Sequence, residues 1–521
     1  MINEGGIFFM KQAINPIIYS DFPDPDVICV NNVFYMVSTT MHFMPCCVIL
    51  KSYNLVNWEI INYVNPFHDE NQSTKLQDNN GIYAKGMWAA CIRYNNGLFY
   101  ILFIANDTGK TYLFTSDDIN GEWKKSEIQG FYHDASLLFD DDKRVFIVHG
   151  NSEIHLTELK SDLSGPKKDG INKIIIRDDK NKVNLGYEGS HIYKINGNYY
   201  IFLIHWPKNN FRTQACFMAK EIDGQWSGKD VLCSDLDNWN NGLAQGGIVQ
   251  TPNKKWYAVL FQDHGAIGRI PVLIPVNWQD DFPVFESSQE KIKTFQVEDF
   301  NPSYKYEPLF TNDFTYLDKN GTEKLKLQWQ FNHIPETSFV KFQNNQFEIT
   351  TSSICKNLCL AQNTLTQRTF GPKCFAEVQV DFSQINEGDF TGIGVLQGDY
   401  AFIAATKTNG KNQIVIATRK SEQELYKIGQ VDKDEVQIIW QTQIQENKII
   451  FRENFDFSLN ADFVDFEYKN ISSENWNKID FKKKLKFGLD HFTGARIALF
   501  NYSTKIIGGK SIFSNFKFIK E

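Results

Sequence analysis

The 521-residue sequence lacks the features that would place it in a membrane or on nucleic acid. No stretch approaches the roughly 18 uninterrupted apolar residues of a membrane-spanning helix. The first residues, 1–16, carry no basic segment and only a short apolar run, so they do not resemble a secretory signal. Basic residues are not in excess either: 54 Lys and Arg stand against 62 Asp and Glu, a net charge of −8. This balance argues against nucleic acid or an anionic membrane as a partner.

Several catalytic and metal-binding motifs are also missing. There is no C-x-x-C pair and no H-E-x-x-H, which argues against a structural zinc site and a zinc protease. There is no P-loop for phosphoryl transfer, and the surroundings of Ser190 do not form a G-x-S-x-G nucleophile elbow. The nine cysteines form an odd and irregular set, which without a secretory signal predicts reduced core thiols in a cytoplasmic protein.

Aromatic residues, in contrast, are abundant, at 14% of the chain with 43 Phe. Together with frequent Asn and Asp, they are typical of β-rich folds and of surfaces that face sugars. The pattern is repetitive: five segments each contain a polar start, a short apolar strand, a tight turn and an aromatic strand. These segments begin at Asp24, Trp88, Asp134, Glu188 and Gln245.

The spacing of the repeats predicts a five-bladed β-propeller. Successive segments start 46 to 64 residues apart, which is enough for one four-stranded sheet each. Turns such as Asn31-Asn32 and Asn196-Gly197 are hairpin sequences. We therefore predict an all-β chain in which residues 1–300 form the propeller.

The first residue of each segment occupies the equivalent position in its blade, which we call its station. Since blades are arranged radially, the three carboxylates, the Trp and the amide at these stations should meet at one end of the central funnel. A single acid at such a position is most often a turn or strand-end cap, but three at matching stations favour a shared site.

Converging carboxyl groups in a polar pocket are the groups that glycoside hydrolysis requires. One carboxylic acid protonates the leaving oxygen, while a second, ionised one activates water or attacks. A third carboxylate nearby helps the acid to keep its proton through like-charge repulsion.

Three short segments resemble glycoside hydrolase family 43, which contains five-bladed propeller enzymes that are mostly β-xylosidases and α-L-arabinofuranosidases. They are Phe22-Pro23-Asp24-Pro25-Asp26-Val27, His133-Asp134-Ala135-Ser136-Leu137 and Glu188-Gly189-Ser190-His191-Ile192-Tyr193. The stretches Ala244-Gln245-Gly246-Gly247 and Phe261-Gln262-Asp263-His264, the latter continuing to Pro271, look like the family's last blade.

The resemblance implies a role for each acid. Asp24 would be the general base and Glu188 the general acid, and Asp134 would help the acid to keep its proton and hold it in place. The family inverts the anomeric configuration in a single displacement, which needs no cofactor.

The resemblance also implies which residues bind the substrate. Arg269 matches an arginine near the acid and the bound sugar, and Trp88 matches a Trp of the pocket wall. Phe43 lies in a loop that in relatives carries aromatic residues closing the pocket, and Gln245 fits a subgroup with an Ala-Gln-Gly-Gly signature. Two of these residues have a plainer alternative: a salt bridge for Arg269, and a place in the core for Trp88.

His264 is the candidate metal ligand. In relatives a histidine in the axial channel binds calcium, largely through waters, so the resemblance implies a calcium ion here. The alternative is a buried, hydrogen-bonded imidazole, because the sequence shows no cluster of oxygen ligands around His264.

The C-terminal part predicts a second β domain. Residues 301–325 lose the blade pattern and form a connector, and in residues 326–521 strands resume with the alternation of a β-sandwich. Trp329-Gln330-Phe331-Asn332-His333 and His491-Phe492-Thr493-Gly494-Ala495-Arg496 resemble the concanavalin-like domain that packs on many propellers of this family.

These observations predict an inverting exo-glycosidase. It would release xylose or arabinose from the non-reducing ends of oligosaccharides derived from xylan or arabinoxylan. Two alternatives stay open at this point: the same chemistry on arabinan or galactan, and a propeller that binds sugar without catalysis. The latter predicts the loss of at least one acid, whereas all three are present.

Overall fold

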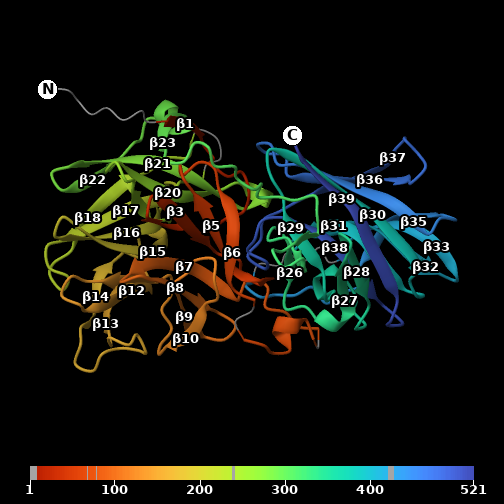
Figure 1. Ribbon diagram of the computed structural model, residues 1–521, viewed down its shortest axis with the longest axis horizontal. Coiled ribbons are helices and arrows are strands. Elements are labelled where there is room, and N and C mark those ends of the chain that lie inside the picture. The colour runs from red at the N-terminus through yellow and green to blue at the C-terminus, as the bar shows by residue number, and fades with distance from the viewer. Residues whose placement is uncertain (1–8, 67–68, 78, 237–240, 421–426) are drawn as a thin grey trace.

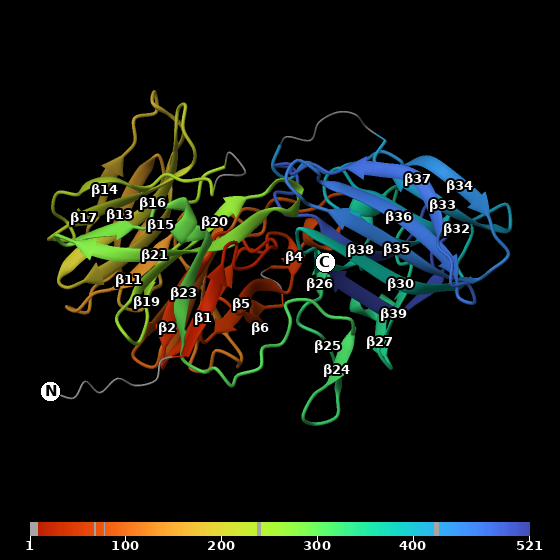
Figure 2. The same cartoon turned by 90° about the horizontal axis from the view of Figure 1, so that it is seen from above.

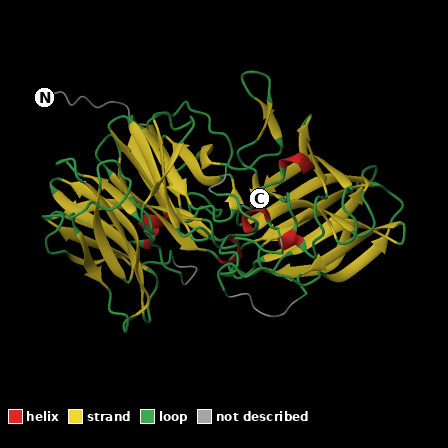
Figure 3. Cartoon of the chain, turned by 90° about the horizontal axis from the view of Figure 1, so that it is seen from below, coloured by secondary structure: helices red, strands yellow, loops and turns green. Residues whose placement is uncertain are grey.

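The computed structural model describes residues 9–66, 69–77, 79–236, 241–420 and 427–521. They form two β-rich parts that lie side by side, with the N-terminal part in red to green and the C-terminal part in green to blue (Figure 1). Helices are few and short, and the regular structure in Figure 3 is nearly all strand, joined by loops. None of the described helices is long and apolar enough to cross a membrane.

The N-terminal part is a five-bladed β-propeller, as predicted. Its described residues form five four-stranded antiparallel sheets, and the strands of each sheet follow one another along the chain except that β4 is left out of blade one. Blade one has β2 (Asp26–Val30), β3 (Val33–Ser38), β5 (Cys46–Ser52) and β6 (Glu59–Asn65). Blade two has β7 (Met87–Asn95), β8 (Leu98–Ala105), β9 (Lys110–Ser116) and β10 (Lys124–Ile128). Blade three has β11 (Ser136–Phe139), β12 (Val145–Asn151), β13 (Glu153–Leu159) and β14 (Asn172–Arg177).

The last two blades follow the same order. Blade four has β15 (Val183–Ile195), β16 (Asn198–Pro207), β17 (Thr213–Ala219) and β18 (Ser227–Leu232), and blade five has β19 (Ile248–Gln250), β20 (Trp256–Asp263), β21 (Arg269–Gln279) and β22 (Phe282–Phe285). Outside the blades, β1 (Phe9–Ile14) pairs with β23 (Thr294–Asp299). The short helices here are η1 (Ser73–Lys75), η2 (Gly265–Ile267) and α1 (Gln289–Lys293).

The turns inside the blades show why these sequences form hairpins. Asn31 and Asn32, between β2 and β3, both have positive φ, at 51° and 64°. Asn196 and Gly197 repeat this geometry in blade four, at 50° and 83°. Two consecutive positive φ angles are the requirement of a type I′ turn, which Asn and Gly meet at low cost.

A buried polar network joins four blades near the propeller axis. Asp26 of β2 is fully buried; its Oδ2 lies 2.7 Å from Nη1 of Arg93 on β7, and its Oδ1 lies 3.1 Å from Nδ1 of His191 on β15. Nη2 of Arg93 donates to Oγ of Ser136 on β11 at 2.6 Å. Although burial opposes it, Arg93 and His191 hold the pKa of Asp26 well below its usual range.

Replacing Arg93 by methionine is expected to destabilise the protein by about 3–5 kcal/mol, because it leaves Asp26 buried without its cation. Urea unfolding followed by tryptophan fluorescence measures this loss. The control is Arg177→Met, whose partner Glu153 is exposed, and we expect about 0–1 kcal/mol there. Equal losses for the two variants would contradict a structural role for the axial pair.

The C-terminal part is a β-sandwich of two large sheets. In the described residues one sheet has eight strands, in the order β34-β33-β32-β31-β38-β29-β26-β4. These are β34 (Gln437–Gln443), β33 (Lys411–Thr418), β32 (Ala401–Thr408), β31 (Asp389–Leu396), β38 (Arg496–Ser503), β29 (Leu365–Arg368), β26 (Gln330–Asn332) and β4 (Phe43–Met44).

The second sheet has seven strands among the described residues, in the order β27-β28-β39-β30-β35-β36-β37. These are β27 (Val340–Gln343), β28 (Gln346–Thr350), β39 (Lys510–Lys520), β30 (Lys373–Gln384), β35 (Lys448–Asp456), β36 (Phe463–Asn470) and β37 (Asn477–Lys484). The alternation of buried and less buried residues along β30 and β35 places one face of this sheet on the sandwich core. The helices η3 (Thr337–Phe339) and η4 (Leu358–Leu360) lie in the connecting loops.

The two parts are joined by more than the chain that connects them. The connecting hairpin β24 (Thr315–Leu317) and β25 (Glu323–Leu325) projects away from both sheets in Figure 2. Strand β4 comes from the propeller sequence between β3 and β5, yet it pairs with β26 at the edge of the eight-stranded sheet. A propeller segment thus completes a sandwich sheet, which fixes one part against the other.

Candidate active site

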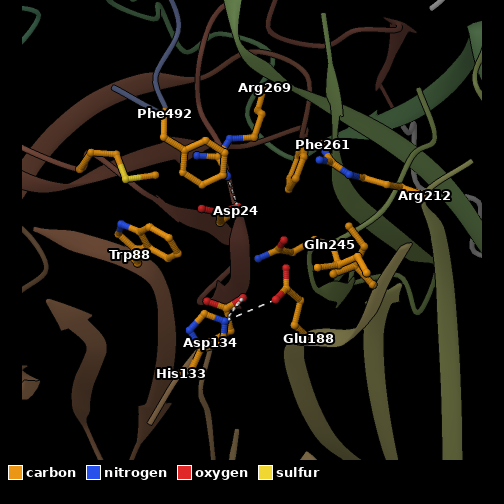
Figure 4. Close-up of a pocket in the computed structure, with 13 residues that line it drawn as sticks. Asp24, Trp88, His133, Asp134, Glu188, Arg212, Gln245, Phe261, Arg269 and Phe492 are labelled. Carbon is orange, nitrogen blue, oxygen red and sulfur yellow. Dashed lines mark hydrogen bonds and ion pairs between the residues drawn. The ribbon is translucent and has the colours of Figure 1, made fainter. Parts of the chain in front are cut away.

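A pocket of about 450 Å³, including its open mouth, lies where the inner strands of the propeller begin (Figure 4). Residues from all five blades and one residue of the sandwich line it: Asp24, Met41, Trp88, His133, Asp134, Leu185, Glu188, Ile204, Arg212, Gln245, Phe261, Arg269 and Phe492. The five stations of the sequence repeat therefore meet in one pocket.

The stations share an unusual backbone conformation. In every blade a residue at or directly after the station has positive φ: Asp24 at 52°, Ala89 at 36°, Asp134 at 46°, Gly189 at 65° and Gln245 at 57°. Most are not glycine, and such strained positions gather at functional sites. In blades one, three and five this residue precedes the inner strand, and in β7 and β15 it lies within the strand at a register shift.

Asp24 is held by two donors deep in the pocket. It is 7% exposed; the Thr39 hydroxyl donates to Oδ2 at 2.7 Å, and Nη1 of Arg269 donates to Oδ1 at 2.9 Å. Burial raises the pKa of Asp24, and Arg269 opposes this rise. Asp24 is therefore a carboxylate with raised proton affinity beside a cation that favours its ionised form, which suits a base.

Asp134 and Glu188 meet at a histidine that the sequence reasoning did not select. Nε2 of His133 lies 3.4 Å from Oε2 of Glu188 and 3.7 Å from Oδ2 of Asp134. Burial raises the pKa of Asp134, which the charge of His133 counters and the charge of Glu188 reinforces. Asn151 also donates its amide N–H to Oε2 of Glu188. His133 directly precedes Asp134 in the family segment, and this adjacency could have identified it as a candidate site residue.

Aromatic side chains from both domains form the walls. The rings of Trp88 and Phe492 lie 5.6 Å apart, and the guanidinium of Arg269 lies 4.4 Å from the ring of Phe492 and 5.4 Å from that of Phe261. Asp21 fixes this arrangement, since its carboxylate accepts the backbone N–H groups of Arg269 and Gly494, each at 2.9 Å. Phe492 belongs to a segment expected in the sandwich, and its place in the pocket wall was not predicted.

Gln245 and Arg212 form the side of the pocket opposite Trp88 (Figure 4). The backbone N–H of Gln245 donates to Oε1 of Gln214 at 2.8 Å, and Arg212 forms an ion pair with Asp263. A Cβ at Gly189 would lie 2.7 Å from Cγ of Gln245, so this position next to Glu188 requires glycine on steric as well as backbone grounds.

The structure does not bring Phe43 into the pocket, so this substrate-binding prediction is wrong. Phe43 is fully buried in β4, where its ring packs against His42 and the guanidinium of Arg496. The reason is the pairing of β4 with β26, which draws this loop into the domain interface.

His264 does not have the surroundings of a calcium ligand. Its Nε2 lies 2.6 Å from Oε1 of Gln262, its ring packs edge-on against Tyr19, and burial lowers the pKa of His264 to about 3. Calcium takes six to eight oxygen ligands. Across the described residues, the one group of three His, Cys, Asp or Glu with converging ligand atoms is elsewhere, at His133, Asp134 and Glu188. Among the described residues, therefore, no cluster of protein ligands surrounds His264.

Comparison with known proteins agrees with this architecture. Residues 13–283 match the family model described as glycosyl hydrolases family 43, and residues 318–519 match a β-xylosidase C-terminal concanavalin A-like domain. A β-xylosidase of Formosa agariphila is 29% identical over 367 residues, which cover 62% of this chain and 59% of that protein. The chain therefore spans about three fifths of this relative's length.

Two solved structures are similar over nearly the whole chain. A bifunctional GH43-CE protein of Bacteroides eggerthii is 34% identical with a TM-score of 0.88, covering 98% of this chain and 64% of that one. A GH43 glycoside hydrolase engineered to display endo-xylanase and exo-arabinofuranosidase activity is 26% identical with a TM-score of 0.86, covering 98% of this chain and all of that one.

Proposed function

Because this chain belongs to glycoside hydrolase family 43, we propose that it is an inverting exo-glycosidase that releases xylose or arabinose from oligosaccharides of xylan or arabinoxylan. The observation that carries the proposal is the meeting of Asp24, Asp134 and Glu188 in one pocket beside Arg269. The sandwich closes one side of this pocket through Phe492, so the site suits the end of a chain better than its middle.

The geometry supports a distinct role for each carboxylate. Asp24 takes a proton from the attacking water, and the cation of Arg269 keeps it ionised before the reaction. Glu188 gives its proton to the glycosidic oxygen from the other side of the pocket. As the bond between the sugar and this oxygen breaks, the water oxygen bonds to the anomeric carbon from the opposite face, so the product has inverted configuration.

The pocket also offers groups that bind a pentose. The rings of Trp88 and Phe492 present apolar faces for the C–H groups of a sugar. Nε and Nη2 of Arg269 are buried and have no acceptor in the part of the chain that the structure describes, so they can donate to sugar hydroxyls. The names of the relatives, β-xylosidase and exo-arabinofuranosidase, support the choice of these two pentoses.

Hydrolysis of 4-nitrophenyl β-D-xylopyranoside and 4-nitrophenyl α-L-arabinofuranoside, assayed side by side, tests the proposal. We expect nitrophenol release from at least one substrate, and the ratio of the two rates identifies the main pentose. NMR should show the inverted anomer as the first product. A rate that falls when a chelator is added would support a metal ion at His264, and an unchanged rate would argue against one. No release from either substrate or from arabinoxylan oligosaccharides, or a retained anomer, would contradict the proposal. Cytoplasmic location stays a prediction.

A further inference from the structure

His133 occupies the space between two of the three carboxylates. Its Nε2 faces Oε2 of Glu188 at 3.4 Å and Oδ2 of Asp134 at 3.7 Å (Figure 4). The side chain is 25% exposed, and its ring lies 6.2 Å from that of Trp88 in the pocket wall. One nitrogen thus contacts both the proposed acid and the carboxylate expected to assist it.

The groups that face His133 make it a cation at neutral pH. They are Asp134 on its own loop, Glu188 on β15 and Asp24 before β2, and together they raise the pKa of His133 to about 9. His149, on β12, adds no charge because burial lowers its pKa to about 4. Arg269 faces Asp134 from β21. The carboxylates therefore surround an imidazolium, with no second cation in contact with Glu188 among the described residues.

The two oxygens of Glu188 have different surroundings. Oε2 accepts N–H groups from His133 and from Asn151. In Figure 4 one oxygen points to His133 and the other points toward Gln245 and the pocket. An oxygen that already accepts two donors is poorly placed to carry a proton, so the transferable proton belongs on Oε1, the oxygen that faces the substrate.

We propose that His133 is a positioning residue for the hydrolysis: it fixes Glu188 with Oε1 toward the glycosidic oxygen, and its charge sets the position of the basic limb of the pH profile. This inference rests on the proposed function. In the step, the O–H bond of Glu188 breaks and the proton goes to the leaving oxygen. The electron pair stays on the carboxylate, next to the imidazolium that stabilises it.

Two variants separate orientation from charge. His133→Gln keeps an N–H donor without the positive charge, and His133→Leu removes both. Because both variants remove the cation beside the carboxylates, the basic limb of kcat/KM should move up by about one pH unit in each. kcat should fall at least about tenfold further in the leucine variant, because the donor that orients Oε2 is also lost.

His155→Gln is the matched control, since His155 lies on β13, two strands out from β11, which His133 precedes, and it stacks on His149 rather than on a carboxylate. Its pH profile should equal that of the wild type. A uniform loss of kcat/KM across the pH range in His133→Gln, with both limbs unmoved, would overturn the proposal in favour of a purely structural role.

NMR tests the same charge without any activity. In protein labelled at histidine Cε1, the signal that His133→Gln removes should titrate above pH 8, and at lower pH in Glu188→Gln. Titration near pH 6.5 in the wild type, unchanged in Glu188→Gln, would overturn the proposal even in an active enzyme. If the wild type cleaves no pentoside while His133 titrates above pH 8, the proposed function is wrong, but His133 is still a cation held between Asp134 and Glu188.

Discussion

Asp24→Asn is expected to lower kcat about 10²- to 10⁴-fold on the preferred pentoside, while the propeller stays folded. Asn accepts the same hydrogen bond from Thr39 and tolerates the positive φ of 52° at this position, but it cannot take a proton from water. The measurement is the initial rate at saturating substrate, with circular dichroism and the unfolding midpoint as checks on the fold.

The Asp24→Ala variant tests the same role by rescue with an added nucleophile. It opens space beside Arg269, and azide, which needs no base, should restore turnover by forming a glycosyl azide of inverted configuration. The control is Asp140→Asn, which alters another buried aspartate, one that binds Lys194 and Tyr199 outside the pocket, and it should leave kcat near the wild-type value. Wild-type kcat in Asp24→Asn would remove Asp24 from the reaction.

The parts of the site that local sequence patterns encode could be predicted. Hairpin turns such as Asn196-Gly197 and the strands beside them are short-range features, so they reveal the repeat. Once the repeat is known, radial symmetry brings equivalent positions together. That is why Asp24, Trp88 and Gln245, which are far apart in the chain, could be expected in one pocket, as the structure shows.

The parts that depend on contact between the domains could not be predicted. Phe43 is in a propeller loop, and only its pairing with Asn332 of the sandwich explains why it is buried there rather than at the pocket. Phe492 enters the pocket for the same kind of reason, since Asp21 of the propeller binds the backbone of Gly494. Such contacts depend on how two folded surfaces meet. The sequence periodicity within one domain does not predict this.

The position of His133 between Asp134 and Glu188 could not be predicted for a different reason. The family segment that includes Asp134 also contains His133, but the sequence does not show which way its ring turns or that it reaches Glu188 on another blade. From the sequence alone, the three carboxylates are the only charged groups expected to act on one another here. With an imidazolium among them, repulsion from Asp134 is only one of two opposing influences on the proton of Glu188.

Glu188→Ala should give a loss that depends on the leaving group. On xylobiose or another substrate with an alkoxide leaving group, kcat/KM should fall about 10²- to 10⁴-fold, because the departing oxygen must be protonated. On a 2,4-dinitrophenyl glycoside of the same sugar the loss should be small, since dinitrophenolate departs without a proton. Asp24→Asn should be slow on both substrates, because water needs a base whichever group leaves.

This comparison assigns the two roles when position alone does not. Both acids stand at equivalent stations of their blades and line the same pocket, so loss of activity on one substrate identifies each as necessary without saying what it does. Equal losses on both substrates in Glu188→Ala would mean that Glu188 is not the acid. A loss confined to the alkoxide leaving group, with Asp24→Asn slow on both, is the result that only an acid at Glu188 and a base at Asp24 produce together.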